Sequence, residues 1–162
     1  MQKAVVLARG LGTRMQKEAG VDLGEKREEL AARGLKVLMP VAGRPFLDYI
    51  VDSLSRAGLT DICFVVAPDA DLMRQAASRI EEQAGVRVSC AVQEEPRGTA
   101  DAVLAAEQFA GGDPFIMCNG DNLYPDSALT NLMELPDGAC GVVAFDPVTL
   151  SRSGNIDPGR TR

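Results

Sequence analysis

The chain has 162 residues, of which 46% are hydrophobic and 25% charged, a composition typical of one soluble globular domain. Its net charge of -6 argues against a nucleic-acid-binding surface, which needs clustered Lys and Arg. No stretch reaches the roughly 18 to 20 apolar residues of a membrane span, so no membrane partner is expected. The sequence starts directly with a short apolar run and lacks a signal-peptide layout, which predicts a cytoplasmic protein.

Short apolar runs alternate with amphipathic stretches along the chain. In chain order we predict a strand over 4–8, a helix over 45–57, a strand over 62–67, a helix over 69–84, a strand over 86–92, a helix over 99–109, a strand over 114–119, a helix over 126–133 and a strand over 140–145. Strands that are apolar nearly throughout are typical of a parallel sheet buried on both faces. The alternation therefore predicts an α/β fold with a mostly parallel sheet covered by helices on both faces.

The segment 16–35 interrupts this alternation, because it is rich in charge and only weakly periodic. We expect it to form an exposed insertion or flap within a single domain that spans residues 1–162. The rest of the chain contains no internal repeat and no low-complexity tract.

Four cysteines lie in or beside apolar runs, and we expect them to be small buried side chains in strands: Cys63, Cys90, Cys118 and Cys140. None of them forms a C-x-x-C pair, and the chain has no histidine. The sequence therefore argues against a structural zinc site.

The carboxyl ends of the predicted strands are the expected place for a ligand, because ligands of parallel sheets bind in the crevice outside those ends. The loops after Ala8, after Val92 and after Cys118 all leave the sheet at this edge. We therefore expect these three loops to be neighbours in space.

The first of these loops reads LARGLGTRM and begins at Leu7. Gly10 and Gly12 allow backbone N–H groups to approach an anion closely, and Thr13 and Arg14 add side-chain donors for phosphate oxygens. Such a glycine-rich turn also occurs for purely structural reasons. It lacks the G-K-[ST] of a P-loop and the third glycine of the dinucleotide-binding fingerprint.

Four segments together resemble the sugar-phosphate nucleotidyltransferases, such as the glucose-1-phosphate thymidylyl- and uridylyltransferases. They are LARGLGTRM at 7–15, LKVLMPVAGRPFLDYIVDSL at 35–54, QEEPRGTADAV at 93–103 and NGDNL at 119–123. In the same order they are similar to the family patterns L-A-x-G-x-G-T-R-M, P-K-x-L-x-P-V-x-G-[KR]-P, Q-x-x-x-x-G-T-A-x-A-V and a G-D at a strand end. The resemblance implies a Rossmann-like three-layer sandwich and an enzyme that joins a nucleoside triphosphate to a sugar 1-phosphate, releasing pyrophosphate.

The resemblance also implies roles for individual residues. The nucleotide base and ribose would be recognised by Leu7, Ala8, Gly10, Gln93, Gly98 and Thr99, and the triphosphate would be held by Gly12, Thr13 and Arg14. Lys36 would contact the reacting phosphates, which makes Arg14 and Lys36 the expected catalytic residues. Asp121 would ligate a Mg²⁺ cofactor. Seen alone, Lys36 fits a surface lysine, Gln93 a polar loop residue and Asp121 a turn or capping residue.

Three features depart from the family pattern. Arg9 stands where the family usually has a small residue, so its side chain either crowds the base site or points away from it. Leu35 replaces the proline that usually precedes the lysine. The family's sugar-binding E-K-P-type segment and a further metal-binding aspartate do not appear, so we expect a truncated chain.

Two alternatives to the sugar-nucleotide reading stay open at this point. One is a non-catalytic nucleotide-binding or regulatory module on the same fold. The other is a related cytidylyl- or molybdopterin-type transferase that acts on a non-sugar phosphate. The sequence leaves open which base and which sugar bind, and whether the protein forms a homo-oligomer.

Overall fold

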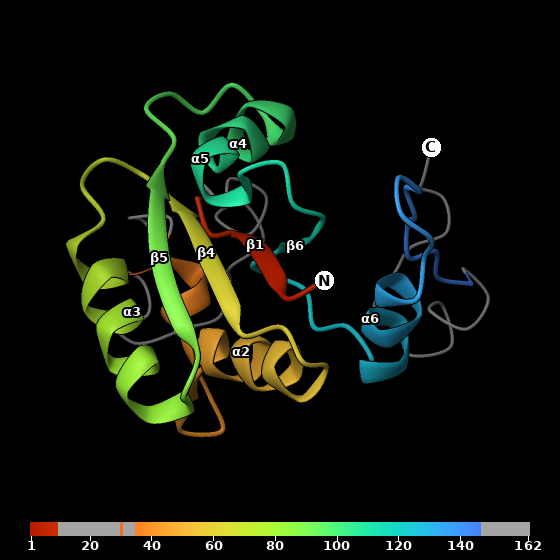
Figure 1. The fold of residues 1–162 in the computed structure, drawn as a ribbon. Helices are drawn as coiled ribbons and strands as arrows, with labels where there is room; N and C mark the ends of the chain where they lie inside the picture. Colours follow the sequence, from red (N-terminus) through yellow and green to blue (C-terminus); the bar gives the residue numbers. More distant parts are fainter. Residues whose placement is uncertain (10–29, 31–34, 147–162) are drawn as a thin grey trace.

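A computed structural model describes residues 1–9, 30 and 35–146. Its centre is a four-stranded sheet with the strand order β5-β4-β1-β6, in which every neighbouring pair is parallel (Figure 1). The strands are β1 (Lys3–Leu7), β4 (Asp61–Val66), β5 (Arg87–Val92) and β6 (Phe115–Asn119). These are four of the five predicted strands.

The two central strands are buried on both faces, as their apolar sequences predict. Successive residues of β1 alternate between two cores: Ala4 and Val6 belong to the larger cluster, and Val5 to the smaller one. In β4, Phe64 likewise faces the larger cluster and Val65 the smaller one. This period of two divides the apolar side chains between two helical layers.

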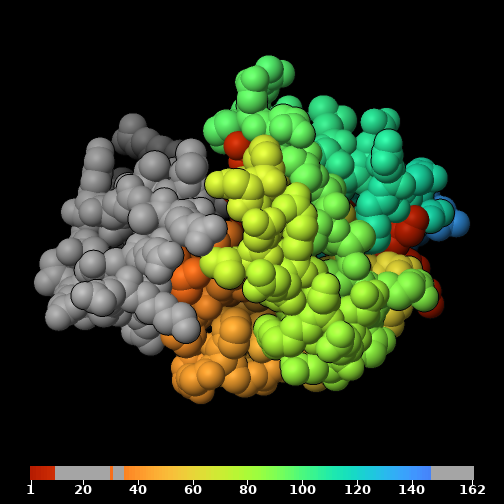
Figure 2. Space-filling view, turned by 90° about the vertical axis from the view of Figure 1, so that its left-hand side faces the viewer, coloured from red at the N-terminus to blue at the C-terminus, as the bar shows by residue number. Residues whose placement is uncertain are grey.

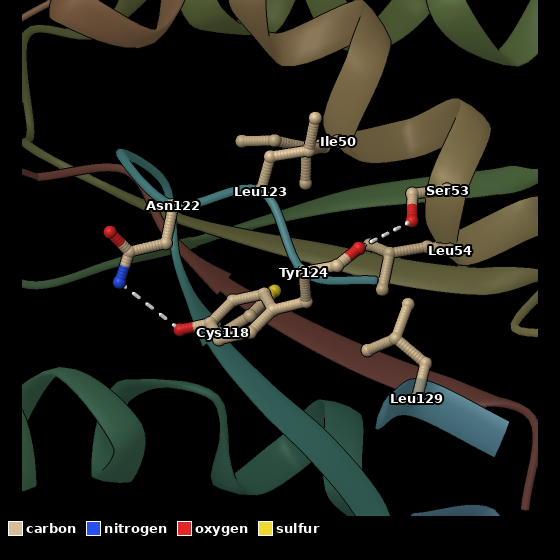
Figure 3. Close-up of a pocket in the computed structure, with 8 residues that line it drawn as sticks. All are labelled: Ile50, Ser53, Leu54, Cys118, Asn122, Leu123, Tyr124 and Leu129. Atoms are coloured by element: carbon tan, nitrogen blue, oxygen red, sulfur yellow. Dashed lines mark hydrogen bonds between the residues drawn. The ribbon is translucent and has the colours of Figure 1, made fainter. Parts of the chain in front are cut away.

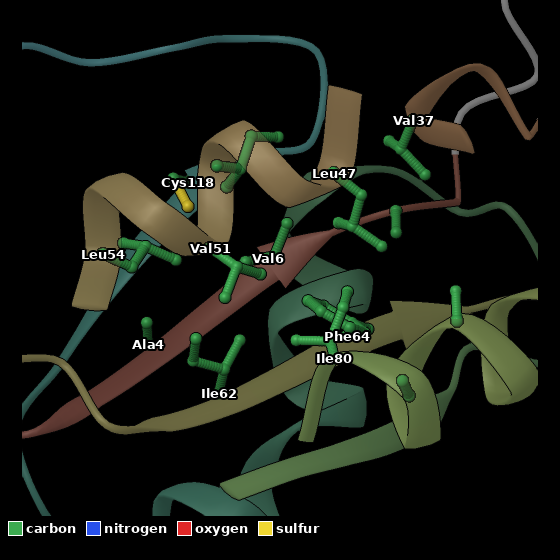
Figure 4. Packing of buried hydrophobic residues seen from close by; sticks show 14 of the residues in the cluster. Ala4, Val6, Val37, Leu47, Val51, Leu54, Ile62, Phe64, Ile80 and Cys118 are labelled. Carbon is green, nitrogen blue, oxygen red and sulfur yellow. The ribbon is translucent and has the colours of Figure 1, made fainter. Parts of the chain in front are cut away.

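Helices cover both faces of the sheet. The larger core packs the sheet against α2 (Phe46–Arg56) and α3 (Asp71–Ala84), through residues such as Leu47, Val51 and Ile80 (Figure 4). On the opposite face, Ala102 of α4 (Thr99–Ala105) and Ala106, just before α5 (Glu107–Ala110), close the smaller core. Figure 2 shows the side chains of α3 and β5 covering one side of the molecule in yellow-green. The predicted three-layer α/β sandwich is confirmed.

The remaining described elements are short. A 3-10 turn η2 (Lys36–Leu38) leads into a two-stranded antiparallel hairpin, β2 (Pro40–Val41) and β3 (Arg44–Pro45), directly before α2. After β6 the chain forms α6 (Asp126–Met133). The predicted helix 99–109 is divided into α4 and α5, because Ala106 leaves the helical conformation with φ -92° and ψ 10°. Among the described residues, none of the helices has the length and apolar character that a membrane span requires.

The predicted strand over 140–145 is wrong. These residues form no regular structure, Val142 is 87% exposed, and Cys140 is exposed as well. An apolar run becomes a strand only when a neighbouring strand accepts and donates its backbone hydrogen bonds. Within the described residues, no strand pairs with this run.

The cysteine prediction holds for Cys63 and Cys118 and in part for Cys90. Cys63 and Cys118 are buried in strands, and Cys90 is half-buried. Burial raises the pKa of the Cys118 thiol to about 12, which keeps this cysteine in its unreactive neutral form. Cys140 is the exception, for the reason given for its segment.

Ion pairs join α2 to its two helical neighbours. The buried carboxylate of Asp48 accepts hydrogen bonds of 2.6 and 3.1 Å from the guanidinium of Arg79 on α3. On the other side, Asp126 at the start of α6 accepts two bonds from Arg56 and one of 2.9 Å from Ser53. These bonds fix the helices on the face that the larger core covers.

We expect the free energy of unfolding to fall as the pH drops below about 4. Arg87 donates hydrogen bonds to Asp61, and Arg56 and Ser53 donate to Asp126, so the pKa of each carboxyl lies below its ordinary value. A carboxyl with a lowered pKa in the folded state stabilises the fold above its unfolded pKa. That contribution is lost as the pH falls through the lowered value. Urea unfolding at neutral and acidic pH measures the decline.

The variant Asp61→Asn isolates one of the two carboxyls, because it keeps the size of the side chain and removes its titration. Its stability should fall less than that of the wild type between about pH 7 and pH 2.5. An equal decline in the two proteins would contradict the assignment to Asp61.

Candidate nucleotide-binding site

The order of the strands places a topological switch point between β1 and β6. The chain moves from β1 through β4 to β5 in one direction, and then crosses to β6 on the other side of β1. The loops after β1 and β6 lead to α2 and α6 on the face of the larger core, and the loop after β5 leads to α4 on the opposite face. Ligands of parallel sheets bind outside the carboxyl ends of the strands, at such a switch point.

The three loops that the sequence predicts as neighbours meet at this edge. The backbone N–H of Gly120, after β6, donates to the carbonyl of Leu7 at 3.0 Å. Arg9, after β1, donates from its guanidinium to the carbonyl oxygens of Gln93 and Glu94, after β5. Side-chain and backbone contacts therefore connect the β1 loop to both of the other loops.

Gly120 makes the approach between β6 and β1 as close as the backbone allows. A Cβ atom at this position would lie 2.8 Å from the carbonyl oxygen of Leu7 and 2.8 Å from Cγ1 of Val37. Both distances are shorter than real side chains show, so only glycine fits without a shift of the backbone. The glycine of the G-D motif thus sets the position of Asp121, which follows it.

Gln93 is held in a fixed position between the strand and the next helix. It is only 4% exposed, and its backbone N–H continues the ladder by donating to Val66 at 2.9 Å. Its side-chain nitrogen donates to the carbonyl of Gly98 at 3.2 Å and to Oδ2 of Asp101 at 2.7 Å. Gly98 has φ 112°, a conformation that favours glycine, and Thr99 follows it as the first residue of α4. Gln93, Gly98 and Asp101 therefore form one hydrogen-bonded network, and Thr99 directly follows Gly98 in the chain.

Asp101 is a member of this network that the sequence does not reveal. A carboxylate in the first turn of a helix is common, because it interacts favourably with the free N–H groups there. The G-T-A-D-A-V pattern therefore gives no sign that Asp101 accepts a hydrogen bond from the side chain of Gln93.

The side chain of Arg9 extends from the β1 loop to the backbone of the β5 loop. It is half-buried, and its guanidinium spans the space between the β1 loop and the β5 loop. Of the two positions that the sequence leaves open for Arg9, the structure has the one that reaches the predicted base site.

Lys36 and Asp121 lie on two segments that pack against each other. Lys36 begins η2 between Leu35 and Val37, which are both buried in the core. Leu35, which stands where the family usually has a proline, is thus a buried residue directly before Lys36. Val37 lies against Gly120, so η2 and the β6 loop pack together next to the exposed Asp121.

The loop after Asp121 packs against α2, β6 and α6 around a small, mostly apolar pocket (Figure 3). Its walls come from α2, β6, the loop and α6, and its lining residues are Ile50, Ser53, Leu54, Cys118, Asn122, Leu123, Tyr124 and Leu129. Ser53 donates to the carbonyl of Tyr124 at 3.3 Å, and Asn122 donates to its phenol oxygen at 3.2 Å. This packing fixes the loop after Asp121 and gives no chemistry of its own.

Part of the predicted site lies outside the described residues. This holds for Gly10, Gly12, Thr13 and Arg14, the residues expected to contact the nucleotide and its phosphates. It also holds for the predicted insertion 16–35, apart from Leu30 and Leu35. The structure places Leu7, Ala8, Gln93, Gly98 and Thr99 at one edge of the sheet. Lys36 lies on η2, which packs through Val37 against the loop that carries Asp121.

Comparison with known proteins supports a common family. The sequence matches the nucleotidyl transferase family over residues 3–139. The bifunctional protein GlmU of Symbiobacterium thermophilum is 35% identical, and the match covers 95% of this chain and 32% of that protein. The mannose-1-phosphate guanyltransferase of Aspergillus fumigatus is 36% identical over 76% of this chain and 32% of its own length. The glucose-1-phosphate thymidylyltransferase of Xanthomonas campestris is 31% identical over 84% and 42%.

Solved structures agree with the sequence relatives. A structure described as a glucose-1-phosphate thymidylyltransferase from Bacillus anthracis superposes with a TM-score of 0.63 at 25% identity, covering 82% of this chain and 49% of that one. The inositol-1-phosphate CTP transferase from T. maritima gives a TM-score of 0.59 at 25% identity, covering 80% and 47%. This chain spans less than half the length of each of these five proteins. The family match over residues 3–139 and the similar fold of these structures agree, and the chain belongs to the nucleotidyl transferase family.

Proposed function

We propose that this protein transfers a nucleotidyl group from a nucleoside triphosphate to a sugar 1-phosphate, forming a nucleotide-sugar and pyrophosphate. The observation that carries the proposal is the junction of the β1, β5 and β6 loops at one edge of a parallel sheet. Each of these loops holds one of the motifs. The relatives named as glucose-1-phosphate and mannose-1-phosphate transferases support a sugar phosphate as the acceptor.

In the proposed reaction, an oxygen of the sugar phosphate attacks the α-phosphorus of the triphosphate. The bond from the α-phosphorus to the bridging oxygen breaks, and pyrophosphate leaves with that oxygen. The attacking oxygen is already anionic near neutral pH, so no general base is needed, which agrees with a chain that has no histidine. The task of the protein is therefore to position two anions and to stabilise charge.

The proposed roles follow the three loops. The backbone of Leu7, Ala8 and Gly10 would contact the base and ribose together with Gln93, Gly98 and Thr99. Gly12, Thr13 and Arg14 would hold the triphosphate. Lys36, on η2, would neutralise charge on the reacting phosphates.

The residues present fit a bound Mg²⁺. Asp121 offers an exposed carboxylate at the end of β6. The described residues contain no cluster of three or more metal-binding side chains. Mg²⁺ commonly binds through one or two carboxylates plus substrate phosphates and water, so a single aspartate suffices to bind it in the presence of the triphosphate. When bound, the ion would supply positive charge to the phosphates.

A panel of substrates tests the proposal. The protein is incubated with Mg²⁺, each of the five common triphosphates and either glucose 1-phosphate, mannose 1-phosphate or inositol 1-phosphate. Pyrophosphate release with a sugar phosphate, together with a nucleotide-sugar detected by mass spectrometry, is the expected result. Release with inositol 1-phosphate alone would favour the transferase for non-sugar phosphates, and no release from any pair would contradict the proposal.

The second candidate, a non-catalytic nucleotide-binding module on this fold, is not favoured by the relatives, which are named as transferases. Nucleotide binding without any pyrophosphate release in the same panel would support that candidate. A cytoplasmic location, the lack of a nucleic-acid partner and a homo-oligomeric state stay predictions from the sequence.

A further inference from the structure

The side chain of Arg9 joins two loops that a strand separates. In the sheet, β4 lies between β1 and β5, so the loops after β1 and β5 are not neighbours in the order of the strands. Arg9 follows β1, and its guanidinium donates to the carbonyl of Gln93 and, at 3.2 Å, to that of Glu94, both after β5. Figure 2 shows atoms of the segment 1–9, in red, beside the green loop after β5. Arg9 therefore bridges the carboxyl end of β4.

The backbone ladder of β5 ends where this bridge begins. Gln93 is buried and donates from its backbone N–H to the carbonyl of Val66 at 2.9 Å. Residues 94–98, which follow it, form no regular structure and are all exposed. An exposed loop with few buried contacts opens easily, so each further attachment lowers the fraction of molecules in which it is open. Arg9 supplies such an attachment at Glu94, the first residue beyond the ladder.

Arginine suits this bridge because of the shape of its side-chain end. A guanidinium presents its N–H donors in a planar fork, so its two terminal nitrogens can donate to two acceptors at once. Here Nη1 donates to Gln93 and Nη2 to Glu94, which are successive residues. Hydrogen bonds from a charged donor are stronger than those between neutral groups. Arg9 is also half-buried, which limits the access of water to these bonds.

We infer that Arg9 is a positioning residue, which fixes the loop after β5 relative to the loop after β1. The inference rests on the proposed function, in which both loops hold expected contact residues of the nucleoside triphosphate, Ala8 before Arg9 and Gly98 at the end of the β5 loop. Arg9 acts through the backbone of the β5 loop. A loop that is already ordered does not have to be ordered by the ligand, so the bridge strengthens the binding of the triphosphate. It leaves the chemical step unchanged, because the bound complex has the same arrangement with or without it.

Hydrogen exchange of the full chain, measured without nucleotide, tests the bridge directly. The variant Arg9→Met keeps an apolar stem and removes the donors and the charge. A peptide over residues 92–98 should exchange about 5- to 30-fold faster than in the wild type, as expected for the loss of two exposed hydrogen bonds. A peptide from α3 should keep its wild-type rate, which verifies that the variant folds, and Arg9→Lys carries the same test if Arg9→Met unfolds. Unchanged exchange over 92–98 would overturn the inference.

Steady-state kinetics, with the triphosphate and sugar phosphate that react, test the effect on binding. Arg9→Met should raise the KM for the triphosphate about 3- to 30-fold, while kcat stays within about 3-fold of the wild type. The control Arg97→Met removes an equal charge from the same loop, where Arg97 is exposed and pairs with Glu95. Its KM should stay within about 2-fold of the wild type, because an exposed pair contributes little. A lower kcat at an unchanged KM in Arg9→Met would overturn the inference.

Arg9→Lys separates the position of the loop from its charge, because lysine keeps the charge and lacks the fork. The loop should still exchange faster than in the wild type, and the KM should stay raised. A wild-type KM together with fast exchange would mean that the charge of Arg9 determines binding, and would overturn the inference. The two proposals fail separately, since the exchange experiment needs no nucleotide. A wild type that releases no pyrophosphate contradicts the proposed function, whereas unchanged exchange in Arg9→Met contradicts this inference alone.

Discussion

Replacing Gly120 by alanine should lower the free energy of unfolding by about 1–3 kcal/mol and displace the loop that carries Asp121. The new methyl group would lie 2.8 Å from the carbonyl oxygen of Leu7 and 2.8 Å from Val37. The first of these atoms is backbone and belongs to a central strand, so the β6 loop must move instead. This movement strains the 3.0 Å bond from Gly120 to Leu7. A shift of about 1 Å at a phosphate site can lower activity about 100-fold.

Urea unfolding and the pyrophosphate assay measure the two effects of Gly120→Ala. Gly141→Ala is the control, since the nearest atom to its new Cβ, at 2.5 Å, is the end of the Leu135 side chain, which can rotate away. Its stability should stay within about 0.5 kcal/mol of the wild type. Adding Val37→Ala to Gly120→Ala removes one of the two clashes and should restore part of the site. If Gly120→Ala keeps wild-type stability and activity, the space between Gly120, Leu7 and Val37 is larger than these distances indicate.

The sheet was predictable because β1, β4 and β6 are almost continuous apolar runs and β5 is apolar at most of its positions. Runs such as AVVLA and ICFVVA alternate with amphipathic helical stretches, which favours their burial between two layers of helices. The run at 140–145 is also apolar but forms no strand, so an apolar composition alone does not predict a strand. The pattern of side chains predicts which residues are buried. A strand also needs a neighbouring strand for its backbone hydrogen bonds, and the local sequence does not indicate which segment that neighbour is.

The site was predictable only to the level of its loops. The order of the motifs and the rule for parallel sheets placed Gln93 and Asp121 at one edge. The path of the Arg9 side chain depends on two carbonyl oxygens more than 80 positions further along the chain. The contact from Gln93 to Asp101 depends on how α4 sits against β5. Such contacts come from tertiary packing, so neither periodicity nor spacing contains them.

Replacing Asp121 by asparagine should lower pyrophosphate release on the order of 100- to 1,000-fold, while the stability of the fold stays close to the wild type. The side chain is exposed, so its loss leaves no buried group without a partner. An amide oxygen carries no net charge and binds a hard cation more weakly than a carboxylate does. Part of the lost activity should therefore return at higher Mg²⁺ concentration.

The control for Asp121→Asn is Asp69→Asn, which changes another exposed aspartate in the loop after β4, at the same edge of the sheet. If Asp121 acts through the metal, only Asp121→Asn should raise the Mg²⁺ concentration needed for half-maximal activity. Equal losses of activity in the two variants would mean that the total negative charge at this edge, and not a metal bound by Asp121, determines the activity. An unchanged rate in Asp121→Asn would contradict the proposal that Asp121 binds the metal. The G-D motif would then have only a structural role, through the close packing of Gly120.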